Sequence, residues 1–321
     1  MQNLTEEDTA DSDSQDEDDC WTALQRASRA GDLPAVRAAV ASGGEDVNAP
    51  PRGYYGRTAL QAACEASHGD VVSALLSAGA QVNDRPGNNG AKNALQIAAG
   101  KPDLALVRTL LDHGADVNAP AARYFGATAL QSACAKGQDD VVALLLERGA
   151  EVNAPPASTA GRTALQAACE GGFIAIARML IQRGAEVDAP ACRYRGFTAL
   201  QAASYGGHAG LVELLLTAGS AGVEEGAASA RGAKGADVNA AGSRFKGGGA
   251  LHAAAEGGHV RVVEALLGAG AEIEAGAGWD RGGRAQTALQ CAAARGHDEV
   301  VRLLRSRGAT GTEGGGVTLF G

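Results

Sequence analysis

Aromatic residues are scarce in this 321-residue chain, at 4% of the sequence, although hydrophobic residues reach 45%. Its core must therefore be built from Ala, Leu and Val rather than from rings, which favours many small, closely approaching helices. No stretch approaches the roughly 18 apolar residues that a membrane-spanning helix needs. We therefore expect a helical fold without a membrane span.

Lysine and arginine are absent from residues 1–19, which contain nine acidic residues. That acidic excess equals the formal net charge of −9, so the remainder of the chain is neutral. An acidic run without apolar spacing cannot offset the entropy of its own ordering, which predicts a disordered tail over residues 1–20. A secretory signal would need a basic start and an apolar stretch. We expect an intracellular protein, cytoplasmic or nuclear and not secreted.

Motifs typical of enzymes are also missing. The sequence has no phosphate-binding Gly-x-x-x-x-Gly-Lys-Ser/Thr loop, no nucleophile elbow and no dinucleotide fingerprint. Its 46 glycines are accounted for by caps, turns and one insertion. We expect no catalytic residue, no cofactor and no enzymatic activity.

What the sequence does contain is a repeat. Residues 56–64, Gly-Arg-Thr-Ala-Leu-Gln-Ala-Ala-Cys, recur with small changes at 126–134, 161–169 and 196–204. The leucine of this motif defines eight units separated by steps of 36, 35, 35, 35, 35, 51 and 38 residues. These landmark leucines are Leu24, Leu60, Leu95, Leu130, Leu165, Leu200, Leu251 and Leu289.

Each unit is expected to form two short helices with defined ends. Thr58 and Gln61 have the spacing of a capping box, which fixes the start of the first helix. Val71, Val72, Leu75 and Leu76 follow the helical period and predict the buried face of a second helix. A glycine separates the two helices, and another follows the second helix, where a left-handed C-cap is easiest for glycine. The extended, Pro- and Gly-containing stretch after it predicts a short β-hairpin finger.

These residues resemble the ankyrin-repeat family, whose pattern is matched along residues 21–309. The family pattern opens with Thr-Pro-Leu-His and closes with Gly-Ala-Asp-Val-Asn; here Ala replaces the Pro, and Gln replaces the His except at His252. The resemblance implies an all-α solenoid of stacked helix-turn-helix units with β-hairpin fingers. It also implies a protein-interaction module.

The resemblance divides the chain into an acidic tail (1–20), an array of eight repeats (21–309) and a Gly-rich tail (310–321). The long step in the sixth unit indicates a mobile insertion near residues 220–234 that leaves the stack intact. Pro102 occupies the glycine position between the helices of the third unit. Because proline cannot adopt a left-handed conformation, we expect an irregular turn there.

The cysteines and histidines follow the repeat. Cys64, Cys134 and Cys169 occupy one equivalent position, and helices stacked ~8–10 Å apart are too distant for a disulfide. No second Cys–His pair accompanies Cys64 and His68 in their repeat, so we expect no metal site. Turn and cap hydrogen bonding explains the periodic histidines. These are His68, His208, His259 and His297, with His252 at a capping-box position.

The fingers carry most of the aromatic residues and twelve basic residues against two acidic ones. Rows of Arg and Tyr are typical of interaction hot spots, although packing between neighbouring fingers would also explain them. The candidate partner-binding residues are Tyr54, Tyr55, Arg123, Tyr124, Phe125, Arg193, Tyr194, Arg195, Arg244, Phe245 and Lys246.

The leading hypothesis is a monomeric, non-catalytic scaffold or adaptor. Its fingers and concave inner-helix face would bind an acidic or phosphorylated protein segment. Nucleic-acid binding through the Arg and aromatic edge is the alternative. A sequence pI near 5.2 and the acidic tail argue against it. The array could also serve as the interaction module of a larger enzymatic assembly.

Overall fold

The computed structural model describes nine stretches of the chain. They comprise residues 21–51, 56–84, 92–122, 126–158, 161–192, 196–218, 235–240, 248–276 and 286–311. The predicted acidic tail, the insertion and nearly all of the Gly-rich tail therefore lie outside the described residues.

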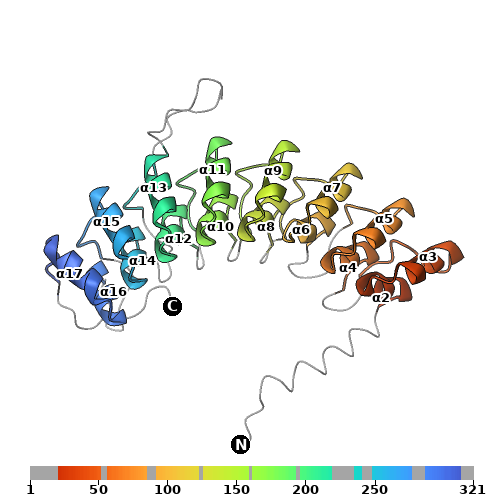
Figure 1. Ribbon diagram of the computed structural model, residues 1–321, viewed down its shortest axis with the longest axis horizontal. Helices are drawn as coiled ribbons and strands as arrows, with labels where there is room; N and C mark the ends of the chain where they lie inside the picture. The colour runs from red at the N-terminus through yellow and green to blue at the C-terminus, as the bar shows by residue number, and fades with distance from the viewer. Residues whose placement is uncertain are drawn as a thin grey trace, which may run out of the picture. The chain divides into compact units, whose positions relative to one another are not determined.

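Within those stretches the chain forms sixteen helices arranged as eight consecutive pairs (Figure 1). This confirms the predicted all-α repeat architecture. The pairs are α2 (Ala23–Ala30) with α3 (Leu33–Ser42), α4 (Ala59–Glu65) with α5 (Gly69–Ser77), α6 (Ala94–Ala98) with α7 (Leu104–Asp112), α8 (Ala129–Ala135) with α9 (Asp139–Glu147), α10 (Ala164–Glu170) with α11 (Ile174–Gln182), α12 (Ala199–Tyr205) with α13 (Ala209–Thr217), α14 (Ala250–Glu256) with α15 (Val260–Gly268), and α16 (Ala288–Arg295) with α17 (Asp298–Ser306).

The predicted capping boxes open the first helices. In α10 the Thr163 hydroxyl accepts from the backbone N–H of Gln166, whose side-chain oxygen accepts in return from the Thr163 N–H. Asn93 takes the role of Thr in front of α6. In the second half of the chain, seven of the predicted turn and cap glycines have a positive φ, for example Gly172 at +78°. These glycines mark the turns between helices and the ends of second helices. Local sequence thus sets both ends of most helices.

The third unit is irregular, as Pro102 predicts. Helix α6 ends at Ala98, and the Lys101 N–H then donates to the Ala98 carbonyl in a tighter turn. In the equivalent turn of the second unit, Ser67 adopts a φ of +61° and is the one non-glycine residue with positive φ among those described. Proline cannot take that conformation, so the shorter helix replaces it.

Small and branched apolar side chains fill the space between pairs. Leu60, Ala63 and Cys64 of α4 are at most 2% exposed, as are Val71 and Leu75 of α5. First helices pack on first helices and second helices on second helices of the next pair, for example α12 on α14 and α13 on α15. Each helix is therefore stabilised mainly by its sequence neighbours, as in other solenoids.

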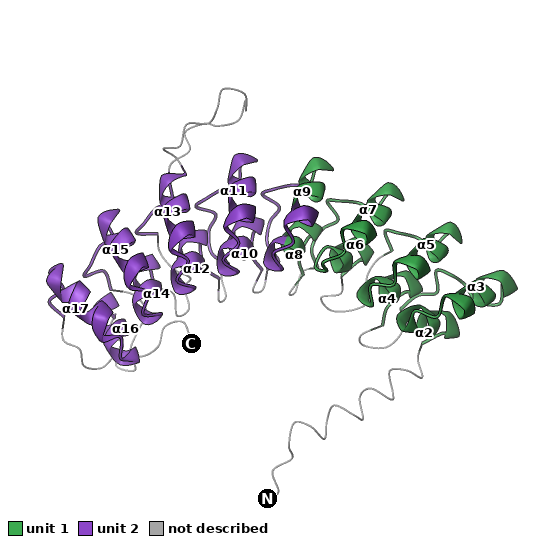
Figure 2. Cartoon of the chain, viewed as in Figure 1, with its two compact units in different colours: residues 1–133, 143–150 green, residues 134–142, 151–321 purple. Residues whose placement is uncertain are grey.

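The chain divides into two compact units (Figure 2). Unit 1 comprises residues 1–133 and 143–150, and unit 2 comprises residues 134–142 and 151–321. The division passes through α8 and α9.

The fingers are described only at their roots. No strand occurs in the described stretches, where Gln286 alone has a bridge-type pairing, and the predicted hairpin tips lie outside them. Gly161 and Gly196 close two of these fingers. A Cβ at either glycine would overlap the backbone N and O atoms of Ala157 or Cys192, respectively. Glycine is therefore required at this point for close approach of two chain segments.

Residues on both sides of the insertion re-form the usual helix end. The Ala236 N–H donates to the Leu215 carbonyl at 2.9 Å, which matches the bond from Ala185 to Leu180 in the preceding unit. The α13 and α15 helices pack together across this point. The repeat thus continues beyond the insertion without a change in helix packing.

Candidate functional site

All eleven candidate finger residues lie outside the described residues. They comprise Tyr54, Tyr55, Arg123, Tyr124, Phe125, Arg193, Tyr194, Arg195, Arg244, Phe245 and Lys246. The structure does describe the two ends of the segment 193–195: the Gly196 N–H donates to the Cys192 carbonyl at 3.2 Å. These eleven residues therefore remain predictions.

The capping-box glutamines attach each finger root to the scaffold. The Gln166 Nε2 donates to the carbonyls of Ala189 and Pro190, at 2.9 and 3.2 Å. Gln96 makes the same two bonds to Ala119 and Pro120. The spacing of Thr and Gln revealed the cap but not this second role, because the finger carbonyls are 23 and 24 residues distant in sequence.

His252 differs from its predicted role in a capping box. Helix α14 begins after Gly249 without a side-chain cap bond. The His252 Nε2 instead donates to the Ala275 and Gln286 carbonyls, at 2.8 and 3.1 Å. Its buried Nδ1 has no hydrogen-bond partner among the described residues. Burial lowers the His252 pKa, and the two backbone hydrogen bonds oppose that effect.

The turn histidines were expected to make turn and cap hydrogen bonds, and turn bonds are present at His259 and His297. No side-chain cap bond is present at His208 or His259. The His259 Nε2 donates instead to the Tyr205 carbonyl in the preceding unit, at 2.9 Å. A Cβ on Gly172 would lie 2.6 Å from the His208 ring, so each ring covers the preceding turn glycine. The histidines thus join neighbouring repeats.

A row of asparagines joins the finger roots to the ends of the second helices. The Asn153 side chain donates to the Gly184 carbonyl at 2.9 Å and accepts from the Glu186 N–H at 2.9 Å. Asn48, Asn83 and Asn239 make both bonds in their own repeats. Asp188, which follows α11 in the fifth unit, takes this position and accepts from the Asp237 N–H, but a carboxylate cannot supply the second bond.

The inner-helix face is narrower than the sequence predicts. Residues 59–64 of α4 and 199–204 of α12 are all buried, so they contribute to packing rather than to recognition. In these two helices exposure begins at the last residue, Glu65 and Tyr205. What the inner helices can offer a partner is therefore their C-terminal ends and the turns that follow.

At these ends, the residue before the cap contacts the residue eight positions later in four of the repeats. We call such a couple an edge pair. Its members change among these four repeats, although all four have the same Thr cap. The described edge contacts are a cation–π contact of Arg29 with Trp21 at 5.3 Å, salt bridges of Arg57 with Glu65 at 3.2 Å and of Arg162 with Glu170, and ring stacking of Phe197 on Tyr205 with centroids 6.0 Å apart.

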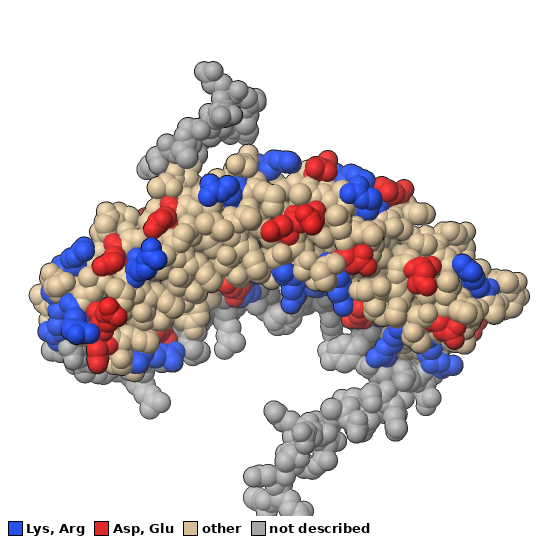
Figure 3. All heavy atoms as spheres, in the orientation of Figure 1, with Lys and Arg blue, Asp and Glu red and all other residues tan. Residues whose placement is uncertain are grey.

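Charge on the described surface is mixed. On the face shown in Figure 3, Lys and Arg are interspersed with Asp and Glu. Arg295 contacts the buried Glu256 carboxylate at 2.7 Å, and Arg148 contacts Asp112 at 2.9 Å. The described edge cations Arg57 and Arg162 are likewise paired with carboxylates. Each of these four arginines is therefore already paired with a carboxylate, which makes it a poor contact for a phosphate backbone.

The described cysteines are not activated as nucleophiles. They are free and buried, and burial raises the pKa of the Cys64 and Cys169 thiols to about 12, which suppresses the nucleophilic thiolate. The described stretches contain no group of three His, Cys, Asp or Glu residues that could hold a metal ion. Nor does a helix within them have the length and apolar character to cross a membrane.

Comparison with known proteins identifies one family. The sequence profile described as ankyrin repeats (3 copies) matches residues 1–86, 84–156, 155–225 and 228–313, which together cover most of the chain. No curated protein matches the chain.

Proposed function

Because the chain belongs to the ankyrin-repeat family, whose repeats generally act as protein–protein interaction modules, we propose that it is a non-catalytic scaffold or adaptor. In this proposal residues 21–309 form the interaction array and bind one partner protein. The free, buried cysteines support a reducing, intracellular location, cytoplasmic or nuclear.

The variation of the edge pairs carries the proposal. Packing imposes the same requirement on every repeat, and the buried positions respond with nearly the same residues. The edge positions instead carry rings in the sixth unit (Phe197 and Tyr205) and opposite charges in the fifth (Arg162 and Glu170). Side chains that vary on an otherwise repeated scaffold can distinguish one partner from another, as specific recognition requires.

The fingers extend this surface in the proposal. Their predicted Arg and Tyr residues favour a partner segment that is acidic or phosphorylated, because Arg pairs with carboxylates and phosphates in bidentate geometry. The edge pairs would contribute apolar and charge-matched contacts beside them. Recognition then combines a basic finger row with a mixed edge.

The experiment is affinity capture from a lysate of the source organism, followed by titration of the captured protein against purified array. The intact chain is compared with a finger variant, Tyr124→Ala/Arg193→Ala/Tyr194→Ala, and an edge variant, Phe197→Ala/Tyr205→Ala. We expect each variant to weaken binding of one acidic partner at least tenfold, since interface anchors of these types cost over 1 kcal/mol on truncation.

The matched control changes the outer helices. Arg178 of α11 and Glu213 of α13 are exposed on the second helices, so Arg178→Ala/Glu213→Ala should bind as the intact chain does. Equal binding of the partner by all four proteins would contradict the proposal. A partner with enzymatic activity would identify the array as the interaction module of a larger assembly.

Nucleic-acid binding is tested separately. Filter binding of single-stranded RNA at two salt concentrations would show a steep loss with salt if the fingers bind phosphates. The paired edge cations described above favour the protein partner. We expect no salt-sensitive RNA binding.

A further inference from the structure

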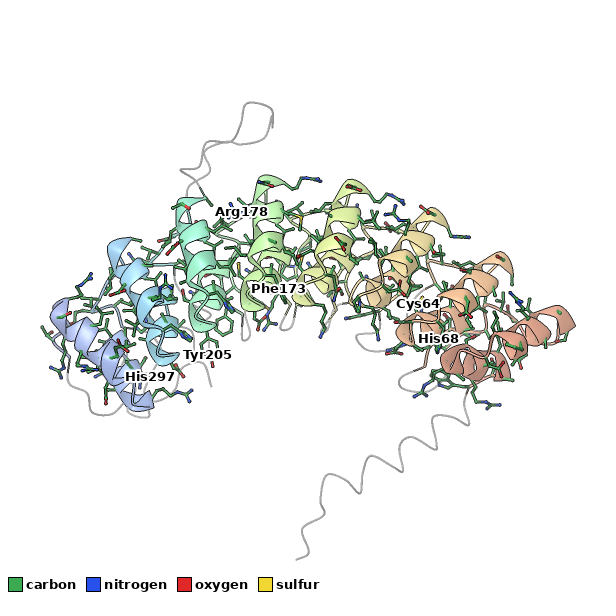
Figure 4. The ribbon with its side chains drawn as sticks, in the orientation of Figure 1. Cys64, His68, Phe173, Arg178, Tyr205 and His297 are labelled. Atoms are coloured by element: carbon green, nitrogen blue, oxygen red, sulfur yellow. The ribbon has the colours of Figure 1, made fainter. Side chains whose placement is uncertain are left out.

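Exposed apolar side chains gather on two adjacent repeats of unit 2. The exposed large hydrophobic residues among those described are Ile174 and Tyr205, at 41% and 37%. Ile174 begins α11 beside the half-buried Phe173, and Tyr205 ends α12 against the half-buried Phe197. Figure 4 labels Phe173 and Tyr205 on these neighbouring repeats. We call these four residues the apolar edge.

The ring pair at one end of the apolar edge is held in a defined position. Phe197 and Tyr205 stack with an interplanar angle of 14°. The carbonyl of Tyr205 accepts from His259, which fixes the backbone at the helix end. Tyr205 remains 37% exposed in this position. The pair is thus a pre-formed surface for another apolar or aromatic side chain, since offset ring contacts add stabilisation beyond burial.

The ion pairs on the neighbouring repeats favour an uncharged segment at the ring pair. Glu170, at the end of the neighbouring helix α10, is paired with Arg162, and Glu256, at the end of α14, is paired with Arg295. These pairs lie on the repeats before and after the ring pair. A charged side chain placed between these pairs would lose hydration. Because both carboxylates are already paired with arginines, it would gain no new partner of opposite charge.

Residues 317–320, Val-Thr-Leu-Phe, have this uncharged, apolar composition. They follow a Gly-rich spacer, residues 314–316. The last described residues are fixed at the eighth repeat, where the Thr310 N–H donates to Glu274 Oε1 at 2.6 Å. The segment therefore starts from a known place within unit 2.

The spacer is long enough to reach the ring pair. Phe320 lies nine residues beyond Gly311, which allows a span of up to ~30 Å. The α16, α14 and α12 helices pack in sequence, so α12 is two steps of ~8–10 Å from α16. Crossing the length of one such helix adds ~12 Å along its axis, which gives a straight-line distance of ~20–25 Å. A third step to Ile174 would bring the distance to the limit of the span.

We propose that Leu319 and Phe320 bind in cis to the Phe197–Tyr205 ring pair and thereby occlude part of the apolar edge. The tether would supply an effective concentration in the millimolar range, so a weak contact is sufficient to keep the site occupied. A partner that uses this edge must displace the segment. The cis contact itself does not depend on the proposed scaffold function; only its regulatory consequence does.

The first test places a photoreactive benzophenone side chain at position 320 of the full-length chain, in place of Phe320. After irradiation at low protein concentration, cross-linked peptides are identified by mass spectrometry. We expect intramolecular cross-links to residues 196–206, reduced at least fivefold by Phe197→Ser/Tyr205→Ser. Circular dichroism confirms that this variant retains its helices. Cross-links that are absent, distributed elsewhere or formed only between chains would overturn the proposal.

The second test measures a labelled peptide with the sequence of residues 314–321 by fluorescence anisotropy. It should bind a chain that ends at residue 311 at least fivefold more tightly than the intact chain, because the intact segment competes with it. The change Leu319→Ser/Phe320→Ser in the intact chain should restore peptide binding, whereas the control Thr312→Ser/Thr318→Ser should not. Equal binding by the intact and shortened chains would contradict occupancy in cis. No partner is needed, so either result leaves the scaffold proposal independently testable.

Discussion

Several residues in this chain act through contacts that the sequence alone does not show. Gly126, Gly161 and Gly196, each two positions before a cap, illustrate this, because their φ is not unusual and their role comes from the approach of a second backbone segment. The sequence shows that such a glycine recurs, but not what it touches. The same applies to the turn histidines, whose period is visible while their bonds to the preceding repeat are not.

Replacing Gly161 by alanine should be strongly destabilising. The added Cβ would overlap the backbone of Ala157, and relief requires opening of the finger root. We expect a loss of about 2–3 kcal/mol in the free energy of unfolding, as for overpacking elsewhere, measured by urea denaturation. Gly69→Ala is the control, since a Cβ there meets nothing within 4 Å. Equal stability of the two variants would contradict the account of the finger roots.

His252 should make stability depend on pH. Its folded-state pKa lies below the ordinary value because of burial, so the ring stays neutral when folded. Above pH ~6.5 the His252 ring is neutral in the unfolded chain as well, so folding is not linked to its protonation. Below pH ~6.5 the unfolded chain binds a proton at His252 that the folded chain excludes, and the stability of the folded chain falls. His252→Gln should keep a donor toward the Ala275 carbonyl and remove this loss.

The measurement is the free energy of unfolding in urea between pH 7.5 and 5.5. The intact chain should lose more stability over this range than His252→Gln does. His208→Gln serves as the control for removal of a histidine at an inter-helix turn. An unchanged pH dependence in His252→Gln would show that the buried ring is not the titrating group.

At the scale of elements, sequence patterns predict most helix ends and fail for the connections between repeats. The Thr-Ala-Leu-Gln spacing correctly predicts the start of α10, and Pro102 correctly predicts the irregular turn after α6. Capping and helical period are local, so a single repeat contains them. The asparagine and glutamine bonds to neighbouring units connect residues 23 to 33 positions apart, and no local pattern encodes them.

The asparagine row gives a prediction at this scale. Asn153→Asp keeps the acceptor for the Glu186 N–H but removes the donor to the Gly184 carbonyl, reproducing the side chain found at Asp188. We expect a loss of about 0.5–1.5 kcal/mol, the usual contribution of one hydrogen bond. Thermal unfolding by calorimetry measures it, with the isosteric reversal Asp188→Asn as the matched variant. A midpoint unchanged by Asn153→Asp would show that this bond does not stabilise the stack.

At the scale of the whole molecule, the sequence predicts the architecture far better than the site. Eight repeats of one hydrophobic pattern leave one way of burying the apolar faces, which is stacking on the next repeat. Recognition depends instead on positions where the repeats differ. The edge pair of Phe197 and Tyr205 was not predicted, because its members lie eight residues apart on either side of a buried helix. Comparing the residue before each cap with the residue eight positions later would have found it.

We infer that the edge pairs carry partner recognition, while the helices and caps beneath them carry stability. The direct measurement is a titration of the captured partner against Phe197→Arg/Tyr205→Glu, which gives the sixth repeat the edge pair of the fifth. We expect a thermal midpoint within a few degrees of that of the intact chain and at least tenfold weaker binding. Unchanged affinity in this stably folded variant would contradict the claim.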